Sequence, residues 1–324
     1  MKFLPIFLIL SLYIYSCTPK TPDLQVKELT VDMAISQLSD SSFFGYLRSF
    51  VCYNDNILMA ESDRAQIFVL DKDLQLVNII GSLGRGPNEL MGANYFHIHK
   101  DTIIASDLGN NRVQFFNILS GDHLGYVHGL MDHFPTTLRA RFIYKDSIFI
   151  GSAEKDSSLV IFDLKSNKST KFGERYEFGS ETRNRIRNYS KNIFSYGDNI
   201  ISISDNQPLI ERYDYEGNII EKYDYSDIPL VKEILNEIEK VTYAENSYFV
   251  TVTDCNIFEN RLFLLLSSTV GEYHCNTLLE FEINEKTELC NIYKLPDKVY
   301  TSIAYDGANL FSYSYKGEIQ RFKL

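Results

Sequence analysis

The sequence predicts an all-β protein, a six-bladed β-propeller whose blades are four-stranded antiparallel sheets. The first observation is a repeat. Polar turns are followed by an apolar residue that opens the second strand of each unit: Ile57, Ile103, Ile148, Ile200, Leu262 and Leu310. Subtraction gives gaps of 46, 45, 52, 62 and 48 residues, and a period of roughly 40 to 50 residues with about four short strands is typical of propellers. The second observation is period-two alternation, as in Ile67 and Val69, which predicts strands.

The last unit predicts how the ring closes. After Leu310 the chain has room for one strand to Tyr315, a Lys316-Gly317 turn, and a strand from Ile319 to Leu324. The stretch from Leu24 to Val31 is strand-like and has no partner in its own region. Pairing it with the C-terminal strand would remove two open sheet edges, which favour aggregation. We therefore expect residues 24–31 to be the closing strand.

One segment departs from the β pattern. Asp227-Ile228-Pro229 opens a stretch with apolar residues at helical spacing and charged residues between them, and these apolar residues are Val231, Ile234, Leu235, Ile238 and Val241. A proline near the first turn is typical of a helix start. This short helical insertion falls between blades four and five and explains the gap of 62 residues. It either caps the ring or binds a partner.

Two neighbouring motifs give a family resemblance. Residues 105–118 contain Asp107, then Asn111-Arg112-Val113 and an aromatic strand, and they resemble an NHL repeat. Residues 81–90 (Gly-Ser-Leu-Gly-Arg-Gly-Pro-Asn-Glu-Leu) resemble the Gly-x-x-Gly-x-Gly-Pro-x-Glu connector of NHL-type and TolB-like six-bladed propellers. The resemblance implies that this connector joins the outer strand of one blade to the inner strand of the next. It implies a fold rather than an activity, because propellers have many unrelated functions.

The amino terminus predicts export. Met1-Lys2 and the apolar run from Phe3 to Tyr15 are typical of a secretory signal and too short for a spanning helix, so residues 1–16 are predicted to be a signal peptide. Ile14-Tyr15-Ser16-Cys17 resembles a bacterial lipobox with Cys17 as the lipidated residue. Residues 17–23 would be a lipidated tether and residues 24–324 the propeller. The absence of Asp at Thr18 resembles an outer-membrane sorting signal in the cell envelope. A plain signal peptide with an incidental Cys17 is the alternative.

Charge and cysteine content limit the partners. The net charge of −11 disfavours binding to nucleic acid, which needs a positive surface. Apart from the lipid anchor, the expected partners are a protein, a peptide or a glycan. Four further cysteines remain in the predicted propeller, namely Cys52, Cys255, Cys275 and Cys290. A Cys255–Cys275 disulfide and free buried thiols are both open, and the spacing matches no zinc site.

The candidate ligand-binding residues are arginines. In a propeller the connectors between blades emerge on one face, and six arginines fall in these connectors or at the start of an inner strand: Arg85, Arg139, Arg141, Arg183, Arg185 and Arg187. Guanidinium groups suit carboxylate or phosphate, so the sequence predicts an anionic ligand at the channel mouth. Pairing with Glu89, Glu174 and Glu181 is the alternative for these arginines.

No sequence motif identifies an enzyme. The chain lacks the phosphate-binding loop, Gly-x-Ser-x-Gly and His-Glu-x-x-His patterns. We therefore predict a lipid-anchored binding module without a cofactor. The alternative is a lactonase-like propeller hydrolase or lyase with a divalent metal in the central channel. His97 and His99 share one face of an expected inner strand and are the candidate metal ligands, although solvated or hydrogen-bonded strand histidines are the commoner explanation.

Overall fold

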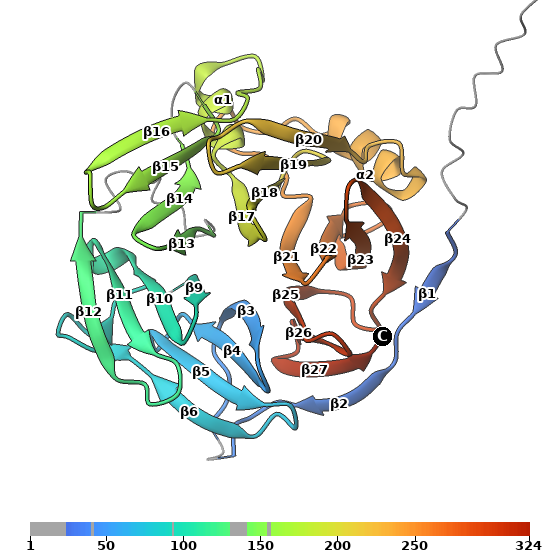
Figure 1. The fold of residues 1–324 in the computed structure, drawn as a ribbon. Helices are drawn as coiled ribbons and strands as arrows, with labels where there is room; N and C mark the ends of the chain where they lie inside the picture. Colours follow the sequence, from blue (N-terminus) through green and yellow to red (C-terminus); the bar gives the residue numbers. More distant parts are fainter. Residues whose placement is uncertain (1–23, 40–41, 93, 130–140, 154–156) are drawn as a thin grey trace, which may run out of the picture.

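The computed structural model describes residues 24–324 apart from 40–41, 93, 130–140 and 154–156. Six sheets surround a central axis, and Figure 1 shows the ring along that axis. The predicted six-bladed β-propeller with four-stranded antiparallel blades is confirmed. All six residues that were predicted to open a second strand lie at the first or second position of that strand.

Strands in blades one to five run in chain order from the centre outward. Blade one contains β3 (Leu47–Tyr53), β4 (Asn56–Glu61), β5 (Gln66–Asp71) and β6 (Leu76–Ile80). Blade two contains β9 (Phe96–His99), β10 (Thr102–Asp107), β11 (Arg112–Asn117) and β12 (His123–His128). Blade three contains β13 (Ile143–Lys145), β14 (Ile148–Ser152), β15 (Leu159–Asp163) and β16 (Lys168–Phe172).

The second half of the ring repeats this layout. Blade four contains β17 (Lys191–Tyr196), β18 (Asn199–Ser204), β19 (Leu209–Asp214) and β20 (Ile219–Asp224). Blade five contains β21 (Val252–Phe258), β22 (Arg261–Ser268), β23 (His274–Ile283) and β24 (Thr287–Lys294). Blade six contains β25 (Tyr300–Tyr305), β26 (Asn309–Ser314), β27 (Glu318–Lys323) and, from the amino-terminal end, β2 (Val31–Ile35).

Ring closure differs from the expectation in its residues. β2 pairs antiparallel with β27, so the closing strand is Val31–Ile35 and not residues 24–31. β1 (Val26–Glu28) pairs parallel with β24 and adds a fifth strand to blade five. The physical reason is the pattern within β2, because Met33 and Ile35 pack into the core while Asp32 forms an ion pair with Arg321 at 2.5 Å. The segment that was expected to close the ring therefore pairs with blade five through β1 and reaches blade six only at Val31.

The core lies between blades, and each middle strand is buried on both faces. In β4, Ile57 and Met59 belong to a cluster shared with blade six, whereas Leu58 and Ala60 belong to a cluster shared with blade two. Such strands read as continuous apolar runs. Full burial of one aliphatic side chain contributes about 1.5–3 kcal/mol, so blade-to-blade packing stabilises the ring.

Two helices lie in the connectors between blades. α2 (Pro229–Glu239) confirms the predicted insertion between blades four and five, begins with Pro229 at its first turn, and buries Val231 and Ile234. α1 (Glu181–Asn188), between blades three and four, was expected only as a long connector. The connector between blades one and two contains the parallel pair β7 (Ser82–Leu83) and β8 (Glu89–Leu90), and the 3₁₀ turn η1 (Leu108–Asn110) follows β10. α1 and α2 both precede an inner strand, which places them on one face of the ring, here called the connector face.

Candidate functional site

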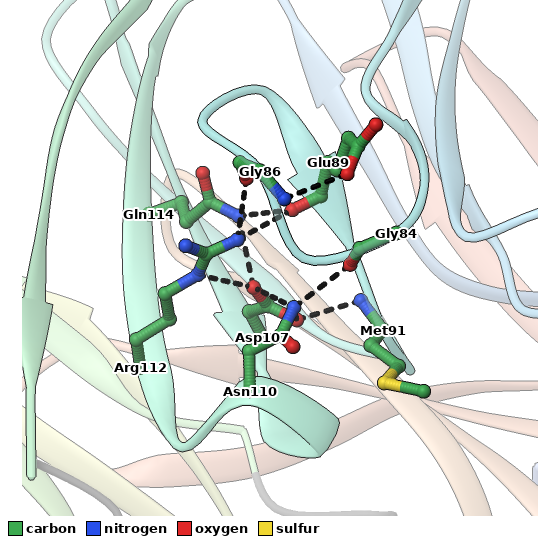
Figure 2. A network of polar contacts seen from close by, with 8 residues as sticks. All are labelled: Gly84, Gly86, Glu89, Met91, Asp107, Asn110, Arg112 and Gln114. Carbon is green, nitrogen blue, oxygen red and sulfur yellow. Dashed lines mark hydrogen bonds and ion pairs between the residues drawn. The ribbon is translucent and has the colours of Figure 1, made fainter.

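The two motifs at the junction of blades one and two bind each other (Figure 2). Asp107, at the end of β10, accepts hydrogen bonds from the Met91 N–H and from Arg112 Nε, both at 2.6 Å. Arg112 also donates to the carbonyl oxygens of Gly86 at 2.7 Å and Glu89 at 2.8 Å. Asp107 is fully buried and Arg112 is 5% exposed, so the charged pair is shielded from water and must be neutralised within the protein.

Further contacts complete this junction network. Asn110 donates to the Gly84 carbonyl at 2.9 Å, and Gln114 donates to Asp107 at 2.8 Å. The Glu89 carboxylate accepts the Gly86 N–H at 2.6 Å. Asp107, Asn110, Arg112 and Gln114 therefore hold the connector against blade two, and their role in this structure is to position the chain.

The structure separates the six candidate arginines. Arg85 is exposed between β7 and β8, and Arg185 is exposed on α1. Arg139 lies outside the described residues. Arg141 is 5% exposed and forms an ion pair with Asp254 of β21. Although burial alone would lower the pKa of Arg141, the neighbouring Asp254 carboxylate raises it.

The Arg141–Asp254 pair crosses the centre of the ring. The Arg141 guanidinium lies 5.7 Å from the ring centre of Tyr95 in the strand region of blade two and 5.5 Å from that of Phe194 in β17. The other carboxylate oxygen of Asp254 accepts the Ile303 N–H of β25 at 2.9 Å. One buried pair thus joins inner-strand segments of several blades, and Arg141 is engaged within the protein.

Arg183 and Arg187 come together at a pocket. They are one helical turn apart on α1 and line a pocket of about 470 Å³ whose other walls come from Asn206, α2 and residues 241–249. Arg183 donates to the Tyr243 carbonyl at 3.2 Å, and Arg187 donates to the Asn206 side chain at 3.0 Å. Burial, and then the positive charge of Arg183, lowers the pKa of Arg187, whereas the nearby Asp205 carboxylate opposes this shift.

No carboxylate pairs with either guanidinium among the residues described by the structure. Glu239 of α2 also lines the pocket but is exposed and forms no ion pair with them in this part of the chain. Two neighbouring cations in a concave site favour an incoming carboxylate or phosphate. We call this the Arg183–Arg187 pocket.

The three acids that were the alternative partners bind elsewhere. Glu89 accepts the Gly86 N–H, Glu174 pairs with Lys222 at 2.9 Å, and Glu181 pairs with Arg175 at 2.7 Å. None of them neutralises a candidate arginine within the described ranges. Pairing with these three glutamates therefore does not explain Arg183 and Arg187.

His97 and His99 lie on β9 as expected, and their rings face blade three. His97 packs 6.5 Å from Phe142 and His99 6.0 Å from Tyr144, both ring-centre distances. Burial, and then the charge of His99, lowers the pKa of His97 to about 4. Across the described part of the chain, no group of three or more His, Cys, Asp or Glu side chains is placed to hold a metal ion.

A second pocket lies at the mouth of the central channel. It has a volume of about 240 Å³ and is lined by residues at the beginnings of the inner strands of blades one, five and six. Asp254, paired with Arg141, contributes to its wall, and so does Arg48 of β3. Tyr248 and Phe249 line both pockets and separate them. No sequence motif surrounds Arg48, so its place in this pocket could not be predicted.

Cys52, Cys255, Cys275 and Cys290 are free thiols. Burial raises the pKa of Cys275 to about 12, and its thiol donates to Thr253 at 3.2 Å. Residues 1–16, Cys17 and the tether to residue 23 lie outside the described residues. Within the described ranges, neither helix has the length and apolar character that crossing a bilayer requires.

Comparison with known proteins supports the architecture. A family model described as a 6-bladed beta-propeller (DUF5128) matches residues 37–227, more than half of the chain. A search of curated proteins gave no match.

Solved structures share the fold at low sequence identity. A Bacteroides fragilis protein whose name describes it as exported is 16% identical with a TM-score of 0.56, over 89% of this chain and 87% of that one. A member of the DUF4221 family from Bacteroides vulgatus is 12% identical with a TM-score of 0.60, over 91% and 97%. Virginiamycin B lyase from Staphylococcus aureus is 11% identical with a TM-score of 0.50, over 90% and 98%. At these identities the likeness concerns the fold alone.

Proposed function

The chain belongs to the DUF5128 family of six-bladed β-propellers, and we propose that it is a lipid-anchored, extracytoplasmic binding module for an anionic ligand. The observation that carries this proposal is the Arg183–Arg187 pocket, where two guanidinium groups meet on the connector face without a carboxylate partner in the described chain. The ligand class is a small molecule, an acidic peptide or an acidic glycan that presents carboxylate or phosphate. Recognition is non-covalent.

Titration calorimetry with citrate and with inorganic phosphate at low salt tests the site. We expect both anions to bind and added salt to weaken binding, because exposed charges are screened. The double variant Arg183→Gln/Arg187→Gln should lose at least about tenfold in affinity, which corresponds to about 1.4 kcal/mol. Arg185→Gln is the matched control, because Arg185 is exposed on the same helix and does not line the pocket. Equal affinity of the double variant and the unaltered protein would disprove the site.

The anchor belongs to the same proposal. Cys17 follows an aliphatic residue and a serine at the end of an apolar segment, and acylation there would hold the propeller in the outer membrane of the cell envelope. Cys17→Ala should move the protein from the membrane fraction to the soluble fraction. Retention of that variant in the membrane fraction would contradict lipidation.

The NHL-like type of the propeller is also proposed. It is supported by the Asp107–Arg112 pair and its contacts with the Gly84–Glu89 connector (Figure 2).

A further inference from the structure

The pocket at the channel mouth is shaped by three irregular inner strands. The pairing of β3, β21 and β25 with their neighbours shifts near the first residues of each strand. The bulged positions include Ser49, Thr253 and Thr301, and all three line this pocket. β-bulges re-aim side chains and are frequent beside binding sites. Blades one, five and six thus each present a hydroxyl residue to one space.

The backbone at Ser49 is strained. Ser49 has a φ of 47°, in the left-handed region that non-glycine residues rarely adopt. Such strain concentrates at binding sites, where the surrounding structure maintains it. Ser49 is 2% exposed, so this conformation is held within the ring near the channel mouth.

Several polar atoms of the pocket lack hydrogen-bond partners in the described chain. They are the Ser49 hydroxyl, the Thr301 hydroxyl and Arg48 Nε, and all three atoms are buried. A buried polar group without a partner costs about 1–3 kcal/mol. These atoms have almost no accessible surface, so a ligand supplies their partners, and recovers that free energy, only when the side chains rotate toward the pocket.

Charge and shape define the ligand further. Arg48 stacks on Tyr46, with its guanidinium 4.3 Å from the ring centre, and no carboxylate pairs with it in the described residues. Asp254 is neutralised by Arg141, so Arg48 gives the pocket its uncompensated positive charge. Tyr46, Tyr95 and Tyr248 add aromatic surfaces suited to a ring face. The volume of about 240 Å³ is below the range of about 300–1,000 Å³ for drug-sized ligands.

We propose that the channel-mouth pocket binds a small polyhydroxylated carboxylic acid, of the size of one sugar acid. Arg48 receives the carboxylate in a forked geometry. Ser49, Thr253 and Thr301 exchange hydrogen bonds with ligand hydroxyls, because a hydroxyl group both donates and accepts. This site adjoins the Arg183–Arg187 pocket and shares Tyr248 and Phe249 with it, but it contains neither of those arginines, and its test uses different variants and a different probe.

Titration calorimetry on the full-length chain in detergent tests the proposal with glucuronate, glucose and acetate. Glucuronate should bind most tightly. Arg48→Met keeps part of the stem and removes the charge, and it should weaken glucuronate binding at least about tenfold. Thr301→Val keeps the side-chain shape and should weaken it about two- to tenfold, as expected for one hydrogen bond. Arg185→Met, which lines neither pocket, should leave the affinity unchanged.

Four results would overturn the proposal. Glucose binding as tightly as glucuronate would remove the role of Arg48, and acetate binding as tightly would remove the role of the hydroxyls. No measurable binding of any probe would remove the site. Unchanged glucuronate affinity in both Arg48→Met and Thr301→Val would place the ligand elsewhere. Circular dichroism and thermal unfolding of each variant identify a loss of folding, and Thr301→Val remains informative if Arg48→Met does not fold.

Discussion

Arginines lie both at the junction of blades one and two and on the connector face near α1. The two regions differ in how many partners the protein itself provides for the guanidinium groups. Arg112 at the junction is 5% exposed, pairs with Asp107 and donates to two backbone carbonyls. Arg183 and Arg187 are partly exposed, lie near each other and have no carboxylate partner in the described residues. A cation whose partners all lie within the chain stabilises the fold. Arg183 and Arg187 form no ion pair within the described residues, although the Asp205 charge acts on Arg187, and we propose that they are available to a ligand.

The region with the clearest sequence motifs is not the region that we propose binds a ligand. The sequence motifs are most distinct at the junction, where every residue shown in Figure 2 takes part in holding the connector. The Arg183–Arg187 pocket is formed without any recognisable motif. In this propeller the distinct motif holds the connector in place, and the proposed binding residues are marked instead by the absence of ion pairs with them among the described residues.

The largest expected effect is at the junction. Asp107→Asn leaves Arg112 buried without its counter-charge and should lower the free energy of unfolding by about 3–5 kcal/mol. Denaturant unfolding measures this loss. Asp55→Asn is the control, because its ion pair with Lys72 is exposed, and it should leave stability nearly unchanged. If Asp107→Asn and Asp55→Asn unfold alike, the junction does not depend on the buried charge.

His97 is a basic side chain whose charged form is disfavoured by burial, in contrast to the paired Arg112. Its folded-state pKa is lowered to about 4 by burial, whereas an unfolded histidine has a pKa of about 6.5. Between these values the unfolded state binds the additional proton, so stability should fall as the pH decreases from about 6.5 to about 4. The loss should reach about 2–3 kcal/mol. His97→Phe should lose less stability over this range, measured by denaturant unfolding at several pH values; parallel curves would contradict the assignment.

Variants of Glu89 measure the contribution of one hydrogen bond at the junction without changing the buried Asp107–Arg112 pair. Glu89→Ala removes the acceptor of the Gly86 N–H and should lower the free energy of unfolding by about 1–2 kcal/mol. Glu89→Gln keeps an acceptor and should lose less. An alanine variant as stable as the glutamine variant would show that this contact does not stabilise the connector.

The smallest expected effect on stability is at Arg183. Arg183→Gln removes a positive charge beside Arg187 together with one hydrogen bond to Tyr243. These effects oppose each other, and the free energy of unfolding should change by less than about 1 kcal/mol. Thermal unfolding measures it. A loss as large as that of Asp107→Asn would show that the pocket arginines are structural, and the contrast between the two regions would disappear.

Much of the fold could be predicted because its signals are local. A polar turn precedes Ile57 and each of its equivalents, and it marks the start of the second strand in each blade. Pro229, together with the spacing of Val231 and Ile234, marks α2. The closing strand was misplaced because Leu24–Val31 also has strand character, although its pairing depends on long-range contacts of Val31–Ile35. Strand propensity alone cannot choose between partners.

α1 and the pockets were harder to predict. Ile186 is the only apolar residue from Glu181 to Asn188, so no apolar stripe indicates a helix. The helix is held instead by side chains that bond to backbone, such as Asn188, which accepts the Tyr176 N–H at 2.7 Å. Arg183 and Arg187 were identified as candidates, but their convergence depends on α2 and residues 241–249. Ser49, Thr253 and Thr301 lie eight or nine positions before Ile57, Leu262 and Leu310, and this recurrence was the available signal for the channel-mouth pocket.

The position of β2 determines when the molecule can finish folding. Val31 pairs with Phe322, so β2, the outer strand of blade six, is synthesised long before its partner β27. At about 5–20 residues per second, that interval is about 15–60 s. Contacts at such large sequence separation form slowly because the intervening chain must first be ordered. Until β27 has been synthesised and ordered, β2 has no partner strand in blade six, so the ring cannot close before the last blade is available.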